Sequence, residues 1–126
     1  MNPKKFSTII ALPGPKRYAH FVKSVAGWGY AWGLYDDGWA SMGTDDGRIT
    51  FPLWPAEEFA AELAKEEWLH FVPRKIDVND ILQEIIPRLR KDGELVAVFP
   101  TPGQKGVLPE LDQLEHDLRE ELSRVE

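Results

Sequence analysis

Residues 30–59, YAWGLYDDGWASMGTDDGRITFPLWPAEEF, carry the signals that decide the fold. Two Asp-Asp-Gly triplets, at 36–38 and 45–47, separate three short runs rich in aromatic and β-branched residues. Asp and Gly tolerate the positive φ of a tight turn, so each triplet is a strong hairpin signal. The stretch therefore predicts an antiparallel meander with strands at 30–35, 39–43 and 48–54.

Helical periodicity continues on both sides of this meander. Apolar residues spaced by three and four predict helices that begin near residues 15, 55, 77 and 109. Residues 70–72 fit a short strand, and the apolar run LVAVF at 95–99 is typical of a central strand covered on both faces. Pro52 cannot donate to a ladder, so strand 48–54 is an edge strand or has its N–H side facing out. We expect an α+β fold, with an antiparallel or mixed sheet of about four to five strands and helices packed mainly on one face.

Length and composition indicate one globular domain. The chain has 126 residues, of which 43% are apolar and 29% charged. We expect residues 1–14 to be a flexible N-terminal arm and residues 15–126 to be a single α+β domain. The apolar run at 7–12 is too short for a signal peptide or a membrane span, which predicts a cytoplasmic protein without membrane contact.

Charge and cysteine content exclude several functions. A net charge of -6 argues against nonspecific nucleic-acid binding, which needs a basic surface. The chain has no cysteine, which excludes disulfides, thiolate metal sites and cysteine nucleophiles and fits a cytoplasmic location.

Three segments rich in tryptophan and proline follow one another in a fixed order. They are WGLYDDGW at 32–39, PLWP at 52–55 and VAVFPTP at 96–102, the last followed by Lys105 and Gly106. Their combination resembles a family of short bacterial proteins catalogued as domain of unknown function 2750, and the resemblance extends from Tyr18 to Leu118. It implies a small, single-domain bacterial protein, and it supplies no catalytic residues.

The acidic turns and the histidines do not form a recognisable metal site. Asp36 and Asp46 lie in turns at opposite ends of a predicted strand, about 17–23 Å apart at ~3.3 Å per residue. Ligands of one cation must lie within about 2.6 Å of it. His20, His70 and His116 fall on three different predicted elements. We therefore expect no metal and no cofactor.

No pattern of residues identifies an enzyme. No serine lies in a G-x-S-x-G elbow, and no pair of acids has a separation that the sequence fixes. The sequence favours a noncatalytic protein, and we assign no catalytic residue.

The aromatic residues are the most informative functional signal. Trp32, Trp39, Trp54 and Tyr35 cluster in the meander, and two interpretations stay open. In the first interpretation, which is slightly favoured, all the rings build a large aromatic core. In the second, some of the rings stay on an open face of the sheet. The second interpretation gives our functional hypothesis, a noncatalytic binding module whose aromatic surface around residues 30–54 holds a protein partner.

An alternative hypothesis concerns the loop at 99–106. Lys105 lies there, beyond the carboxyl end of a predicted strand, where open α/β sheets often bind ligands. This predicts a small-ligand protein or enzyme with an anion pocket near residues 99–106. The leucine face of the last helix leaves both a monomer and a homodimer open.

Overall fold

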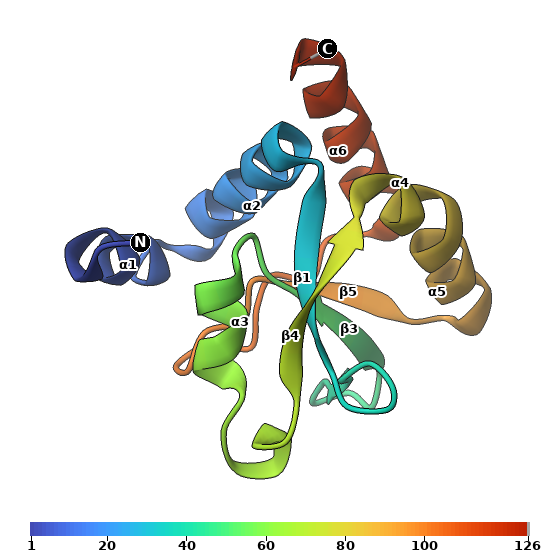
Figure 1. Ribbon diagram of the computed structural model, residues 1–126. Helices are drawn as coiled ribbons and strands as arrows, with labels where there is room; N and C mark the ends of the chain where they lie inside the picture. The colour runs from blue at the N-terminus through green and yellow to red at the C-terminus, as the bar shows by residue number, and fades with distance from the viewer. Residues whose placement is uncertain (126) are drawn as a thin grey trace.

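The computed structural model describes residues 1–125 and has an α+β fold with five strands in two small sheets (Figure 1). The elements in chain order are α1 (Pro3–Ile10), α2 (Gly14–Trp28), β1 (Tyr30–Tyr35), β2 (Met42–Gly43), β3 (Ile49–Leu53), α3 (Glu57–Leu63), the 3-10 helix η1 (Glu66–Trp68), β4 (Val72–Asp77), α4 (Val78–Asp80), the π-helix η2 (Ile81–Ile85), α5 (Ile86–Asp92), β5 (Leu95–Val98) and α6 (Leu111–Val125).

The predicted meander forms only in part: β2 pairs with β3 as expected, but the main partner of β1 is β4. β1 pairs in antiparallel register with β4, from Tyr30 opposite Asp77 to Tyr35 opposite Val72. Both Asp-Asp-Gly turns form, but after the first turn only Trp39 bridges back to β1, and β2 is two residues long. The bridge to Trp39 and the ladder with β4 lie on opposite edges of β1, so the two pairings coexist.

The second sheet has the order β2-β3-β5 and mixes both strand directions. β2 is antiparallel to β3, and β3 is parallel to β5. β3 is therefore the central strand and β5 lies at the end, so β5 is not the central strand that we expected, and the first of our two alternatives for strand 48–54, an edge strand, is wrong. Pro52 is tolerated because β2 pairs only with residues 49 and 50, so no strand needs its missing N–H.

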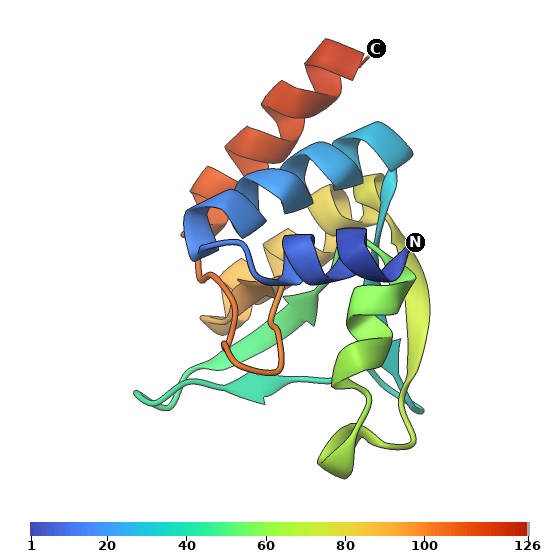
Figure 2. The same cartoon turned by 90° about the vertical axis from the view of Figure 1, so that its left-hand side faces the viewer.

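One pair of backbone hydrogen bonds joins the two sheets. The N–H of Trp32 donates to the carbonyl of Trp54 at 2.9 Å, and the N–H of Trp54 donates back at 2.8 Å. Helices α1, α2, α5 and α6 lie together above the three-stranded sheet in Figure 2, whereas α3 lies beside the ribbon formed by β1 and β4.

The N-terminal segment is a helix, in contrast to the predicted flexible arm. The Asn2 side chain caps α1 by accepting from the N–H of Lys5. Phe6 stacks on Phe59 of α3 with ring centroids 5.1 Å apart, and Ile9 is buried. These apolar contacts fix α1 to the domain.

The helical segment after β4 changes its winding near a proline. Asp77 caps it, as predicted, by accepting from the N–H of Asn79 at 2.8 Å. Pro87 has no N–H to offer the preceding turn, and the wide π-turn η2 lies directly before it. Gly93 ends α5 with a φ of 71°.

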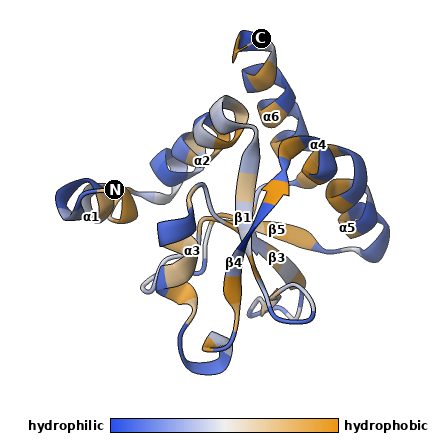
Figure 3. Ribbon diagram, viewed as in Figure 1, coloured by the Kyte–Doolittle hydropathy of each residue, from blue (hydrophilic) through white to orange (hydrophobic). Residues whose placement is uncertain are grey.

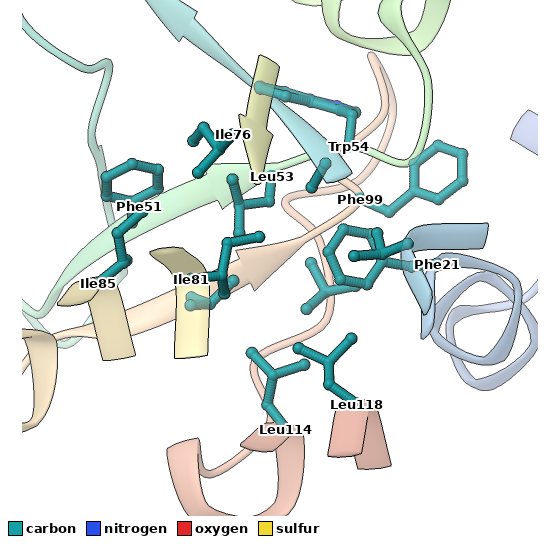
Figure 4. Packing of buried hydrophobic residues seen from close by; sticks show 14 of the residues in the cluster. Phe21, Phe51, Leu53, Trp54, Ile76, Ile81, Ile85, Phe99, Leu114 and Leu118 are labelled. Atoms are coloured by element: carbon teal, nitrogen blue, oxygen red, sulfur yellow. The ribbon is translucent and has the colours of Figure 1, made fainter. Parts of the chain in front are cut away.

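The core lies between the strands and the helices. Figure 4 shows Ile81 and Ile85 of η2 facing Phe51 and Leu53, while Leu114 and Leu118 of α6 point toward Phe21 of α2. All four residues of β5 are buried, and β5 is uniformly hydrophobic in Figure 3. Packing of the leucine face of α6 onto α2 thus completes the core within one chain.

A buried arginine ties the loop after β5 to α2. Arg17 is 1% exposed, and its guanidinium donates to the carbonyls of Phe99 and Leu12 and to the side chain of Gln104. Burial lowers the pKa of Arg17. Among residues 1–125, no helix is both long enough and apolar enough to span a bilayer.

We expect the substitution Trp54→Phe to destabilise the fold. The Trp54 ring is completely buried, and its Nε1–H donates to the carbonyl of Pro100 at 2.8 Å. Phenylalanine leaves that carbonyl unpaired, so the free energy of unfolding should fall by about 1–3 kcal/mol. Urea denaturation followed by far-UV circular dichroism measures this free energy of unfolding. The control Trp28→Phe changes a ring that is 70% exposed and should stay within about 0.5 kcal/mol of wild type; equal losses in both variants would contradict the prediction.

Candidate functional site

A tight turn folds the chain after β1 back onto its own strand. The N–H of Asp36 donates to the carbonyl of Gly38 at 2.9 Å, and Asp37 takes a φ of 55°. Tyr35 and Trp39 are thereby brought together, with ring centroids 5.0 Å apart and planes at 76°. This edge-to-face pair is the centre of the candidate site.

Two residues of the β1–β4 ribbon, Gly33 and Arg74, hold the rings of Tyr35 and Trp39 in place. A Cβ atom on Gly33 would lie 2.9 Å from the Trp39 ring, so only glycine lets the indole lie on the strand. The guanidinium of Arg74, on β4, lies 4.4 Å from the Tyr35 centroid and 5.9 Å from the Trp39 centroid. At an exposed site such stacking contributes about 0.5–1 kcal/mol.

The aromatic row continues onto β3. Phe51 lies 5.7 Å from Trp39 between centroids, and the Arg88 guanidinium lies 5.9 Å from the Phe51 ring. A cavity of about 390 Å³ opens here, with Ser41 and Glu94 also in its wall. We call Tyr35, Trp39, Phe51, Arg74 and Arg88 the aromatic ridge.

Trp32 lies on the opposite face of the ribbon and does not join the ridge. It packs edge-to-face against Tyr30, and the Lys75 ammonium lies 4.3 Å from the Tyr30 centroid. A cavity of about 320 Å³ lies beside these rings and also contains His20. Burial, with a smaller effect of Lys5, lowers the pKa of His20.

Trp54 cannot belong to a binding surface, contrary to our expectation. Its side chain is completely buried at the junction of the two sheets. Strand alternation alone did not reveal this burial, because the bond to Pro100 comes from a loop 46 residues further along the chain. The aromatic residues thus divide between core and surface.

Lys105 lies at a cavity with a volume of about 460 Å³. Its walls come from β2, the end of α3, η1 and the loop after β5, and include Met42, Leu63 and Trp68. The Lys105 ammonium pairs with Asp45 at 2.7 Å. Glu66, in the same wall, has a φ of 55°, a strained backbone conformation for a residue other than glycine.

The acidic turns make local contacts. Asp45 pairs with Lys105, and Asp46 accepts a hydrogen bond from Thr44, which is the main cause of the lowered pKa of Asp46. Within residues 1–125, no three His, Asp or Glu side chains converge in a way that would hold a metal ion.

Comparison with known proteins places the chain in a family. Residues 18–118 match the family described as protein of unknown function, DUF2750. The chain belongs to this family. No curated protein and no solved structure matches the chain. The match starts inside α2, so α1 lies outside the part that the DUF2750 family shares.

The sequence did not reveal the cations that stack on aromatic rings, whether in the ridge or, for Lys75, on the opposite face of the ribbon. Arg74 and Lys75 lie in the segment VPRKID, in which apolar and charged residues do not alternate regularly, so we expected a strand only at 70–72. Arg88 lies on the helix after Pro87 and approaches Phe51 only in the folded chain. No local sequence pattern at Arg74, Lys75 or Arg88 indicated that these cations would lie against aromatic rings.

We expect the substitution Gly33→Ala to displace the Trp39 ring. The added methyl group would overlap the indole, which should cost about 1–3 kcal/mol of unfolding free energy and change the near-UV circular dichroism of the DUF2750 protein. The control Gly27→Ala, within α2, has nothing within 4 Å of its added methyl group and should be neutral or up to about 1 kcal/mol stabilising. An unchanged near-UV spectrum of Gly33→Ala would contradict the expected displacement.

Proposed function

We propose that this DUF2750 protein is a noncatalytic binding module that holds a protein partner in the bacterial cytoplasm through the aromatic ridge. The supporting observation is the stacked, partly exposed group of Tyr35, Trp39 and Arg74. Tyrosine, tryptophan and arginine are the residue types most enriched in interface hot spots, because they offer large rigid contact area and several donors.

Charge favours an acidic partner segment. The chain has a net charge of -6, yet the charged groups that stack on the ridge rings are two arginines, Arg74 and Arg88. Neither makes an ion pair with a carboxylate of residues 1–125, so their charge is available to an incoming group. A carboxylate that pairs with either guanidinium gains a charge-assisted hydrogen bond beside the aromatic rings.

We expect the substitution Arg74→Glu to abolish partner capture while the fold persists. Arg74 is exposed, so its loss removes only the stacking energy from the fold. A photo-reactive benzoylphenylalanine placed at Ser41, in the cavity beside the ridge, should form a discrete cross-linked adduct in bacterial cells. Arg74→Glu should reduce the yield of that adduct by at least about tenfold, as the loss of a hot-spot arginine does.

The matched control is Lys16→Glu, which makes the same change of charge at an exposed position of α2. It should leave the adduct unchanged. Adducts of equal yield from both variants, or no adduct from the Ser41 probe, would count against the aromatic ridge as the binding surface.

A second candidate function, a small-ligand protein or enzyme with an anion pocket near residues 99–106, has its own supporting observation. The cavity of about 460 Å³ has the size of a small-molecule site, and the strained Glu66 lies in its wall. Both ammonium groups in the wall already have partners, because Lys105 pairs with Asp45 and Lys65 with Glu62 at 3.2 Å. An anion must therefore displace a carboxylate from Lys105, which costs little at an exposed pair.

If this cavity binds anions, phosphate and phosphorylated metabolites should raise the melting temperature of the wild-type protein, and Lys105→Gln should remove the shift. The control Lys23→Gln, on the exposed face of α2, should keep it. A thermal-shift screen in which no anion stabilises the wild type would remove the support for this candidate.

A further inference from the structure

β4 uses only one of its two edges for strand pairing. Its six residues form an antiparallel ladder with β1, and no strand within residues 1–125 pairs with its other edge. Only Ile76 of β4 is buried, and the middle of the strand is hydrophilic in Figure 3. The outer edge of β4 is therefore a row of backbone groups that faces solvent.

The register between β1 and β4 shows which backbone groups of β4 point to its outer edge. The N–H of Val78 donates to the carbonyl of Gly29, so in this ladder alternate pairs, including Gly33 with Arg74, exchange hydrogen bonds. Trp32, opposite Lys75, instead directs its N–H and carbonyl away from β4 to Trp54. By the same alternation Pro73, Lys75 and Asp77 direct their backbone groups outward.

The outward row has a defined set of donors and acceptors. Lys75 and Asp77 each present an N–H, and Pro73 and Lys75 each present a carbonyl. The carbonyl of Asp77 does not count, because Asp77 is the N-cap residue of α4. Pro73 has no N–H to donate. Two carbonyls and two N–H groups are enough for a short extended segment to add to the ribbon as a further strand.

Side chains on both faces of this edge carry positive charge. Arg74 stacks over Tyr35 on the face of the aromatic ridge, and Lys75 stacks over Tyr30 on the opposite face. A second copy of β4 in antiparallel pairing would bring these cations against their own kind, which disfavours a homodimer through this edge. An acidic segment would instead meet a cation on each face.

We infer that the outer edge of β4 receives an extended, acidic segment of a partner protein by strand addition. The inference rests on the proposed function and specifies the partner's chemistry and its mode of docking. The segment forms backbone hydrogen bonds with Lys75 and Asp77. Adjacent acidic residues in the segment point to opposite faces, one toward Arg74 and the other toward Lys75.

The test uses a defined peptide and the amide exchange of the intact protein. The probe is acetyl-Thr-Val-Thr-Glu-Glu-Thr-Val-Thr-amide, and the matched peptide replaces both glutamates with lysine. Nuclear magnetic resonance measures the dissociation constant of each peptide and the exchange rate of each backbone N–H. At about 90% saturation with the acidic probe, exchange of the Lys75 N–H should slow by about tenfold, because only the unoccupied fraction exchanges. The lysine peptide should bind at least about tenfold more weakly.

Two substitutions at one position separate backbone pairing from charge. Lys75→Pro removes the outward N–H, which an edge strand tolerates, whereas Lys75→Gln keeps that N–H and removes only the charge. We expect Lys75→Pro to weaken probe binding at least about tenfold and Lys75→Gln to weaken it less. If Lys75→Pro does not fold, the exchange rate of the Lys75 N–H in the wild type decides alone.

Several outcomes would overturn the inference. They are no binding of the acidic probe, equal binding of both peptides, unchanged exchange at Lys75 in the complex, or equal effects of the two Lys75 variants. A dimer of wild type that Lys75→Pro dissociates would assign the edge to a second copy instead. Loss of the Ser41 adduct in Arg74→Glu but not in Lys75→Pro would overturn strand addition and leave the proposed function standing.

Discussion

The reciprocal hydrogen bonds between Trp32 and Trp54 are the constraint on which the rest of the structure depends. They join the β1–β4 ribbon to the sheet of β2, β3 and β5, which otherwise share no ladder. Because Trp54 is completely buried, water does not compete for these bonds. The junction fixes the ribbon so that one of its faces continues toward Phe51 and the other turns toward α3.

The loop after β5 is held to this junction by polar groups from two directions. The Trp54 ring donates to Pro100, and Arg17 donates to Phe99 and Gln104. Phe99 has a φ of 57°, a conformation that tertiary contacts must maintain. Lys105 and Pro102, which lie in the wall of the cavity of about 460 Å³, belong to this fixed loop. The cavity is thus a consequence of the same buried contacts that close the core.

The chain is acidic overall, but the charged side chains that stack on its aromatic rings are basic. Arg74, Lys75 and Arg88 all contact aromatic rings of the sheets. The acidic residues of α6 pair instead among the arginines of α5 and α6. The ribbon of β1 and β4 therefore carries cations over aromatic rings on both of its faces, in a chain whose net charge is -6.

The sequence by itself determined the local structure of this protein. Turn chemistry at Asp37 and Gly38, the cap at Asp77 and the leucine spacing of 111–118 act over a few residues, so the turns, the α+β class and the main helices could be predicted. β1, β3 and β5 were also located closely, whereas only the first residue of β4 lies in the strand expected at 70–72. Family membership also followed from local motifs.

Only the tertiary structure decided which strands pair and which rings are buried. β1 forms its ladder with β4, from Tyr30 opposite Asp77 to Tyr35 opposite Val72, although β2, β3 and α3 lie between the two strands in the sequence. Trp54 is buried by Pro100, while Trp39 stays at the surface beside Arg74. The candidate site arises from these long-range contacts, whose energies depend on the whole core and leave no pattern in a short stretch of sequence.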